Sequence, residues 1–288
     1  MMALMTVDRL ESLLDRFRVR AHLFHAGPLC GVTHFPAEPG RGFLHVLRAG
    51  RTEVMREGSR EVVVVDEPSL IVFPRALDHD FRNAPTAESD FTCAAFDVDG
   101  GRTHPLLQTL PPFLVLPLDA VASLRPALDL LFAEVDEVRC GRRVLADRLF
   151  EVVLVQLFRW FLDHGDELGH PPGLLAGLAD EQLAPALVAV HEAPGEPWTV
   201  ESLARSCALS RSSFAARFAS VLGMPPMTYV LEWRMTLAQE MLGAGESVTR
   251  TAAELGYATP AAFSRAFSQR LGASPRAWLA STWAPEVA

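Results

Sequence analysis

The chain lacks lysine altogether: all 26 of its Lys-plus-Arg positions are arginine. Its four cysteines lie far apart and form no C-x-x-C pair, which argues against a disulfide framework. Long apolar runs are also missing, because the longest, at residues 152–162, contains Gln156 and Arg159 and is too short to span a bilayer. Acidic residues follow the N-terminal methionines too closely for a signal peptide. Together these absences predict a cytoplasmic protein with no membrane partner.

Negative charge dominates the chain but is unevenly distributed. The net charge is −9, whereas residues 197–283 contain 8 Arg and 5 Glu and carry +3, which leaves −12 on the remainder. A mildly basic C-terminal unit on an acidic body is typical of a DNA-binding unit carried by a sensor. The length of 288 residues is sufficient for two domains with a helical segment between them.

The C-terminal third contains one pattern twice. S-x-x-x-F-x-x-x-F-x-x-x-L-G-x-x-P-x-x-Y spans residues 210–229, and T-x-x-x-F-x-x-x-F-x-x-x-L-G-x-x-P-x-x-W spans residues 259–278. The identical pairs, each 49 positions apart, are Phe214 and Phe263, Phe218 and Phe267, Leu222 and Leu271, Gly223 and Gly272, and Pro226 and Pro275. So many matches at one offset indicate an internal duplication. Each copy is predicted to be the second helix of a helix-turn-helix together with the helix end that follows it.

Turn and cap residues divide this region into helices. The expected N-caps are Thr199, Ser210, Ser247 and Thr259. Gly223 and Gly272 are expected to end the two repeated helices in the left-handed conformation. Between the copies, residues 226–242 predict one helix of roughly 25 Å. Residues 180–190 predict a lead-in helix before the first helix-turn-helix.

The N-terminal third has a different sequence pattern, with short apolar runs separated by turn residues. Residues 8–17 predict a short amphipathic helix, and from residue 21 to about residue 118 short Val-, Phe- and Leu-rich runs alternate with turns, which predicts an antiparallel sandwich or barrel. The segment P-x-A-x-x-H-x-x-x-N at residues 74–83 resembles the second signature of the cupin barrel, with Ala76 in place of Gly. The first cupin signature is only half present, because His45 stands alone and Leu47 occupies the place of the second histidine.

The cupin resemblance suggests a metal site. The residues concerned allow two interpretations, one with a bound metal and one without. The candidate ligands are His45, His79, Cys93 and His104. Three imidazole nitrogens and one thiolate suit one divalent ion, zinc or similar. In the alternative, Cys93 is a buried small apolar residue and the histidines bond to backbone or line an empty pocket. The missing second histidine and glutamate of the first signature argue against an oxygenase-like iron site.

The middle of the chain is predicted to be helical. Leucines and valines at spacings of 3 and 4 indicate helices at about residues 124–135 and 142–164, with residues 150–162 apolar almost all round. Helix packing within the chain explains such a surface, and so does a homodimer interface. The clearest linker is Gly169–Gly173.

The C-terminal unit resembles the DNA-binding domain of AraC/XylS-type transcription regulators. The match covers about the last 100 residues and includes G-Y-x-x-x-x-x-F-S-R-A-F-x-x-x-x-G-x-S-P-x-x-W at residues 256–278. The resemblance implies that the second helix of each unit enters a major groove, about one turn of DNA apart. The residues expected to face outward are Arg211, Ser212, Ala215, Arg217, Pro260, Ala261, Ser264 and Arg265. The first copy, with two outward arginines, is expected to dominate base reading; alternatively, the arginines only face solvent.

The sequence thus predicts an α+β protein with a cupin-like sensor barrel at residues 1–118, a helical connector and linker at 119–179, and a double helix-turn-helix domain at 180–288. The predicted function is sequence-specific regulation of transcription in response to a small molecule or metal. Expected partners are double-stranded promoter DNA, an effector, RNA polymerase and a second copy of the chain, and no organic cofactor is expected. The alternative is a cupin-type metal enzyme, a dioxygenase or isomerase, with an accessory helical domain.

Overall fold

The computed structural model describes residues 8–83, 89–98, 105–164 and 172–282. Contacts divide the chain into two compact units, one made of residues 17–169 and the other of residues 1–16 with 170–288. The sequence predicts boundaries at residues 118 and 179, so the observed grouping differs. The predicted connector helices belong to the β-sheet unit, and the first helix belongs to the helical unit. No helix of the described residues is both long and apolar enough to cross a membrane.

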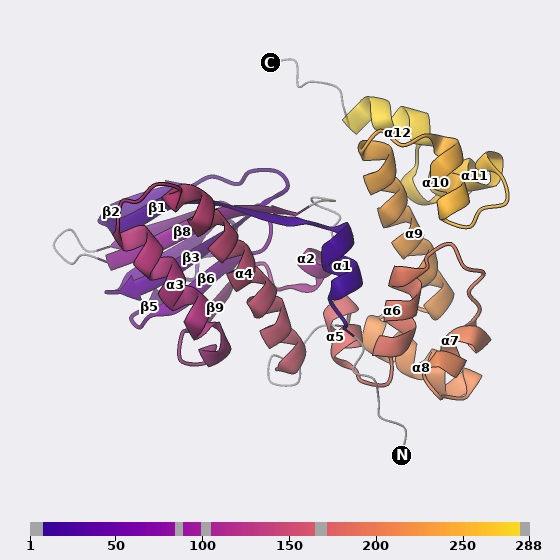
Figure 1. Ribbon diagram of the computed structural model, residues 1–288, viewed down its shortest axis with the longest axis horizontal. Coiled ribbons are helices and arrows are strands. Elements are labelled where there is room, and N and C mark those ends of the chain that lie inside the picture. Colours follow the sequence, from indigo (N-terminus) through magenta and orange to yellow (C-terminus); the bar gives the residue numbers. More distant parts are fainter. Residues whose placement is uncertain (1–7, 84–88, 99–104, 165–171, 283–288) are drawn as a thin grey trace. The chain divides into compact units, whose positions relative to one another are not determined.

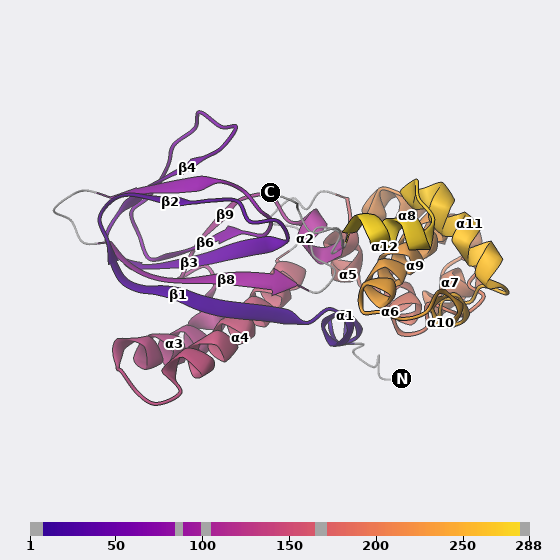
Figure 2. The same ribbon diagram turned by 90° about the horizontal axis from the view of Figure 1, so that it is seen from above.

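Two antiparallel sheets build the unit of residues 17–169 (Figures 1 and 2). The five-stranded sheet contains, in spatial order, β1 (Val19–Leu29), β8 (Ser89–Val98), β3 (Arg41–Ala49), β6 (Ser69–Phe73) and β9 (Leu114–Pro117). The four-stranded sheet contains β2 (Gly31–Phe35), β7 (His79–Asn83), β4 (Thr52–Arg56) and β5 (Val63–Val65). The described strands pair as two sheets instead of one closed barrel, and the arrangement is cupin-like.

The core of this unit lies between the two sheets. Successive side chains of a strand point to opposite faces, so alternate residues of β3, β7 and β8 share the interior. The buried cluster consists of Phe35, Phe43, Leu47, Val54, Val65, Ile71, Phe73, Phe81, Phe91, Cys93 and Ala95. Two of the strands around it, β2 and β7, were not expected from apolar runs, because each contains few large apolar residues. Strand β7 contains the end of the histidine motif of residues 74–83.

Two helices, α3 (Arg125–Asp136) and α4 (Arg142–Asp163), pack together on the outer side of the five-stranded sheet (Figure 2). The same unit contains α2 (Pro105–Thr109) and the short 3-10 helix η2 (Ala122–Leu124). Both predicted connector helices are confirmed to within a few residues. The apolar residues of α4 are mostly buried, and α4 packs on β1 and α3, so packing within the unit accounts for most of its wide apolar surface.

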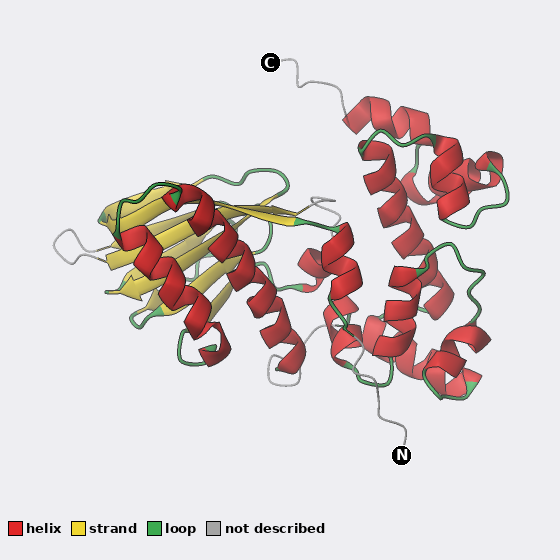
Figure 3. Cartoon of the chain, in the orientation of Figure 1, coloured by secondary structure: helices red, strands yellow, loops and turns green. Residues whose placement is uncertain are grey.

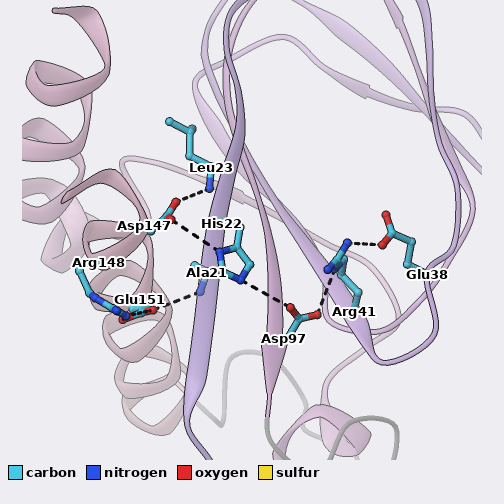
Figure 4. Close-up of polar contacts among 9 residues, drawn as sticks. All are labelled: Ala21, His22, Leu23, Glu38, Arg41, Asp97, Asp147, Arg148 and Glu151. Carbon is cyan, nitrogen blue, oxygen red and sulfur yellow. Dashed lines mark hydrogen bonds and ion pairs between the residues drawn. The ribbon is translucent and has the colours of Figure 1, made fainter. Parts of the chain in front are cut away.

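Carboxylate side chains of α4 form hydrogen bonds with the backbone of the edge strand β1 (Figure 4). The carboxylate of Asp147 accepts a hydrogen bond from the backbone N–H of Leu23 at 2.7 Å, and Glu151 accepts one from Ala21 at 3.4 Å. The ring of His22 lies between Asp147 and Asp97, at 3.7 and 3.9 Å. An exposed strand edge is a template for pairing with another chain. Here carboxylates of α4 occupy two of its free donors.

The second unit is helical (Figures 1 and 3). Its elements are α1 (Glu11–Arg16), α5 (Leu174–Ala179), α6 (Ala184–Glu192), α7 (Val200–Ser206), α8 (Arg211–Leu222), α9 (Pro226–Gly243), α10 (Val248–Glu254), α11 (Pro260–Leu271) and α12 (Pro275–Thr282). The long helix α9 connects the pair α7–α8 to the pair α10–α11. Helix α1 packs on α6, and Arg9 donates a hydrogen bond to the carbonyl of Leu178 at 3.1 Å.

The helix boundaries follow the predicted caps. The hydroxyls of Thr199, Ser210, Ser247 and Thr259 each accept a hydrogen bond from the backbone N–H three residues later. Gly223 and Gly272 end α8 and α11 with φ of 73° and 74°. These cap predictions are confirmed. The lead-in helix is α6, four residues later than predicted, and α5 was not predicted because its six residues are too few to show a helical period.

Candidate nucleic-acid interface and sensor interior

Helices α8 and α11 each bury one face and expose the other. Phe214 and Phe218 of α8 and Phe263 and Phe267 of α11 are at most 1% exposed, so they form the cores of their helix-turn-helix units. Of the predicted contact residues, Arg211, Ser212, Arg217, Pro260, Ala261 and Arg265 are exposed, and Ala215 and Ser264 are partly buried. The paired phenylalanines therefore orient the polar face of each helix outward, as the spacing predicts.

A buried hydrogen bond joins the lead-in helix to α9 beneath the first helix-turn-helix. Nε2 of His191 and the hydroxyl of Tyr229 lie 2.5 Å apart, and both side chains are buried. Burial lowers the pKa of His191 to about 3 and raises the pKa of Tyr229. Both groups are therefore neutral at physiological pH, and they fix α6 against α9 without carrying a charge into the core.

Most arginines of this unit are engaged by the protein itself. Among the eight arginines of residues 197–283, Arg205, Arg217, Arg250 and Arg270 form ion pairs, and Arg234 donates to backbone carbonyls. Arg211, Arg265 and Arg276 have no ion pair or side-chain hydrogen bond with any residue that the structure describes. An exposed guanidinium without an internal partner is free to contact phosphate or a guanine edge.

Arg217 differs from the other predicted contact residues because Asp180 holds it. Its guanidinium lies 2.8 Å from the Asp180 carboxylate, whose side chain is only 8% exposed. The same carboxylate accepts backbone N–H groups of Gln182 and Leu183 at 2.9 and 3.1 Å. Arg217 therefore anchors α8 to the start of the lead-in segment. On α11, Arg270 makes the corresponding anchor to Glu232 of α9.

Arg276 was missed by sequence reasoning. It is exposed on α12, directly after Ser274 and Pro275, and the hydroxyl of Ser274 accepts the N–H of Ala277 at 3.2 Å. The signal that would have found it is this S-P-R start of a helix directly after the repeated pattern. We add Arg276 to Arg211 and Arg265 as a candidate phosphate contact.

In the β-sheet unit, two of the predicted metal ligands meet between the sheets. Nε2 of His45 on β3 and Nε2 of His79 on β7 lie 3.0 Å apart, and both side chains are buried. Nδ1 of His79 donates to the carbonyl of Leu77 at 2.8 Å, so its Nε2 carries no proton and accepts from Nε2–H of His45. Nδ1 of His45 is then the unprotonated nitrogen, and it is buried without a hydrogen-bond partner among the described residues.

The surroundings keep both rings neutral. Burial, reinforced by the neighbouring His79 and His25, lowers the pKa of His45 well below its usual range. Burial lowers the pKa of His79 to about 4, although the Leu77 hydrogen bond partly offsets it. The ring of Phe73 stacks on that of His79 with centroids 3.7 Å apart. The interior is thus an aromatic box around two uncharged imidazoles.

Within the described residues, Cys93 does not complete a metal site with this pair. Cys93 lies opposite His45 on the neighbouring strand, and burial raises the pKa of its thiol well above the usual value. His104 lies outside the described residues. Within the part of the chain that the structure describes, no group of three or more His, Cys, Asp or Glu is arranged to hold a metal ion. Two nitrogens are one fewer than the three protein ligands of a catalytic zinc site.

Known protein families match both units. A family model described as Cupin matches residues 8–163, and one described as Helix-turn-helix domain matches residues 203–281. The DNA-binding domain of AdpA, solved in complex with a target DNA, is 32% identical over 35% of this chain and 93% of its own, with a TM-score of 0.34.

Full-length relatives are transcription regulators. The regulator AlkR of Acinetobacter baylyi is 34% identical over 62% of this chain and 59% of its own length. An AraC-like transcription regulator of Streptomyces antibioticus is 30% identical over 93% of this chain and 97% of its own. A cupin-like domain joined to two helix-turn-helix units defines a DNA-binding transcriptional regulator. The chain belongs to the AraC-like family of these regulators.

Proposed function

We propose that the chain binds promoter DNA through α8 and α11, and that a signal bound between the two sheets controls this binding. The outward arginines Arg211 and Arg265, one on each duplicated helix and neither paired with a described residue, carry the proposal. A gel shift tests it: the chain should retard DNA from upstream of its own gene at concentrations that leave unrelated DNA of equal length free. Equal retardation of both would contradict sequence-specific binding.

The signal that we propose is a small molecule or one divalent metal ion held near His45 and His79. Two observations support a ligand at this place: the facing Nε2 atoms, and a buried Nδ1 of His45 that has no hydrogen-bond partner in the described part of the chain. The third and fourth ligands would be Cys93 and His104, because three imidazole nitrogens and one thiolate suit zinc. A bound zinc ion would supply a fixed positive charge to an interior that is otherwise neutral. Both imidazoles would hold it through their facing Nε2 atoms, which requires His45 to carry its proton on Nδ1 instead.

If this interior holds zinc, the purified chain should contain about one equivalent of metal, and His45→Gln or His79→Gln should lose it. After the metal has been removed, zinc added back at about 100 times its dissociation constant should stabilise the wild-type chain by about 2.7 kcal/mol relative to the metal-free chain. Elemental analysis and thermal unfolding with zinc chloride measure both effects. His34→Gln is the control, because the side chain of His34 is 59% exposed and bonds to Asp80. A purified chain that contains no metal, and whose melting temperature does not change when zinc is added, would contradict the metal proposal. The remaining hypothesis would then be an uncharged organic effector.

We further propose that α4 pairs with α4 of a second copy. Leu145 and Val152 lie two turns apart on this helix and are 43% and 45% exposed. Val144 beside them and Leu130 on α3 are 66% and 54% exposed, so apolar surface persists after the unit has folded. Such a stripe is suited to helix pairing.

Substituting both Leu145 and Val152 by Arg should convert a dimer to a monomer, because two charges would be buried in the paired stripe. Sedimentation equilibrium measures the mass. Val32→Arg is the matched control, since Val32 is 63% exposed on β2 in the other sheet and should leave the dimer intact. A wild-type chain that sediments as a monomer, or a double variant that remains dimeric, would contradict the pairing.

We infer that the chain acts as a regulator and not as an enzyme, because its named relatives are transcription regulators. The cupin-type dioxygenase or isomerase alternative receives no support from the two-nitrogen interior. We propose that the protein works in the cytoplasm on promoter DNA, with RNA polymerase as its macromolecular partner there.

A further inference from the structure

Arg234 makes an unusual set of contacts near the middle of α9. Its Nε donates to the carbonyl of Pro194 at 2.7 Å, and its Nη2 donates to the carbonyl of Glu196 at 2.8 Å. The guanidinium also lies over the ring of Tyr257, 5.8 Å from the centroid. Pro194 and Glu196 precede the first helix-turn-helix, whereas Tyr257 is in the turn of the second. One side chain on the connecting helix therefore contacts segments of both DNA-binding units.

The loop at residues 193–197, to which Arg234 donates its hydrogen bonds, packs closely against the second helix-turn-helix unit. A Cβ built on Gly195 would overlap the carbonyl oxygen of Glu254, and one built on Gly256 would overlap the carbonyl oxygen of Gly195. The loop is also braced internally, because Nε1 of Trp198 donates to the carbonyl of Ala193 at 2.8 Å. The two backbones can approach this closely only because both positions are glycine.

These contacts give the two helix-turn-helix units a second connection besides α9. A lone helix bends gently along its length, and bending or twisting of α9 would change the distance and phase between α8 and α11. The loop at residues 193–197, held by Arg234 and seated on Gly256, closes a ring of contacts between the first unit, α9 and the second unit. Such a ring resists that motion.

We propose that Arg234 is a positioning residue that sets the spacing between the two DNA half-sites. It touches no DNA itself; through the loop at residues 193–197 it holds α8 and α11 at one separation and phase. The inference rests on the proposed DNA binding by both helices. It adds that the chain tolerates only one spacing between the two grooves that it reads.

The test uses the full chain and a duplex selected by the wild-type chain from random DNA. Companion duplexes have one or two base pairs inserted between the half-sites, and a further duplex retains one half-site only. The wild-type chain should bind the respaced duplexes at least about tenfold more weakly than the selected one, within the range of coupling between two sites. For Arg234→Ala, the ratio of the affinity for the selected duplex to the affinity for a respaced duplex should fall to about twofold. The reason is that the variant loses affinity for the selected duplex but not for the respaced ones. Binding to the single half-site should be unchanged.

Arg250→Ala is the matched control, because Arg250 pairs only with Glu246 and Glu254 among the described residues and should keep the wild-type spacing profile. Arg234→Lys, which keeps the charge but places its donors on a single nitrogen, should restore part of the profile. If Arg234→Ala fails to fold, Gly195→Ala opens the same contact from the other side and should flatten the profile likewise. An equal loss on every duplex, half-site included, would show a merely structural role and overturn the proposal, as would an unchanged profile. Failure of the wild-type chain to select any duplex would instead contradict DNA binding itself.

Discussion

A chain with both Arg211→Ala and Arg265→Ala should bind its selected DNA at least about 30-fold more weakly than the wild-type chain. Each guanidinium is exposed and has no partner among the described residues, so its full hydrogen-bonding capacity is available to DNA. A bidentate arginine–guanine contact contributes about 1–3 kcal/mol of discrimination, and each 1.4 kcal/mol corresponds to a tenfold change in affinity. Fluorescence anisotropy of a labelled duplex measures the loss.

The folded state should be unaffected by these two substitutions, because neither side chain contributes an ion pair to the described structure. Arg250→Ala is again the control: its guanidinium is already engaged by Glu246 and Glu254, at 3.0 and 2.9 Å, and should contribute little to DNA binding. If the double variant and the wild-type chain were both folded and bound DNA with equal affinity, Arg211 of α8 and Arg265 of α11 would not contact DNA.

The second large effect is expected from Gly256→Ala, which should lower the free energy of unfolding by about 3 kcal/mol. Gly256 has φ of 75°, and left-handed backbone costs a residue with a Cβ roughly 1–2 kcal/mol. The new methyl group would also overlap the Gly195 carbonyl oxygen, so the loop at residues 193–197 must move. Chemical denaturation followed by tryptophan fluorescence measures the change, with Trp198 and Trp233 as reporters in this unit.

Gly272→Ala separates the two causes. Gly272 has φ of 74°, but nothing lies within 4 Å of a Cβ built there. The Gly272 variant should therefore lose only the conformational cost, about 1 kcal/mol. If both variants lost the same amount, the contact between residues 195 and 256 would contribute nothing to the stability of the helical unit.

The helical unit was largely predictable because its signals are local. Caps such as Ser210 and Thr259 and the terminating glycines act within one turn of the chain, and the phenylalanine spacing of four defines the buried face of each helix. What could not be predicted is the partner of each arginine. Arg217 and Arg211 lie on the same helix and look equivalent in sequence, but only Arg217 meets Asp180, which is 37 residues away.

The β-sheet unit was predictable in class but less so in detail. The apolar runs indicated most strands, whereas β2 and β7 contain few large apolar residues and were missed. The sequence named His45 and His79 as candidate ligands, and the 3.0 Å distance between their Nε2 atoms shows that they face each other. The tautomers, the aromatic box and the neutrality of both rings depend on strands that are far apart in sequence, so no local pattern encodes them.

The most direct test of DNA binding by this chain is the salt dependence of its affinity for the selected duplex. Neutralisation of roughly four to six phosphates per subunit predicts that the logarithm of the association constant falls with the logarithm of salt concentration with a slope of about −4 to −5. The Arg211→Ala and Arg265→Ala double variant should have a slope smaller by up to about 2, depending on how many of the two contacts are to phosphate. A slope near zero for the wild-type chain would contradict DNA binding by α8 and α11.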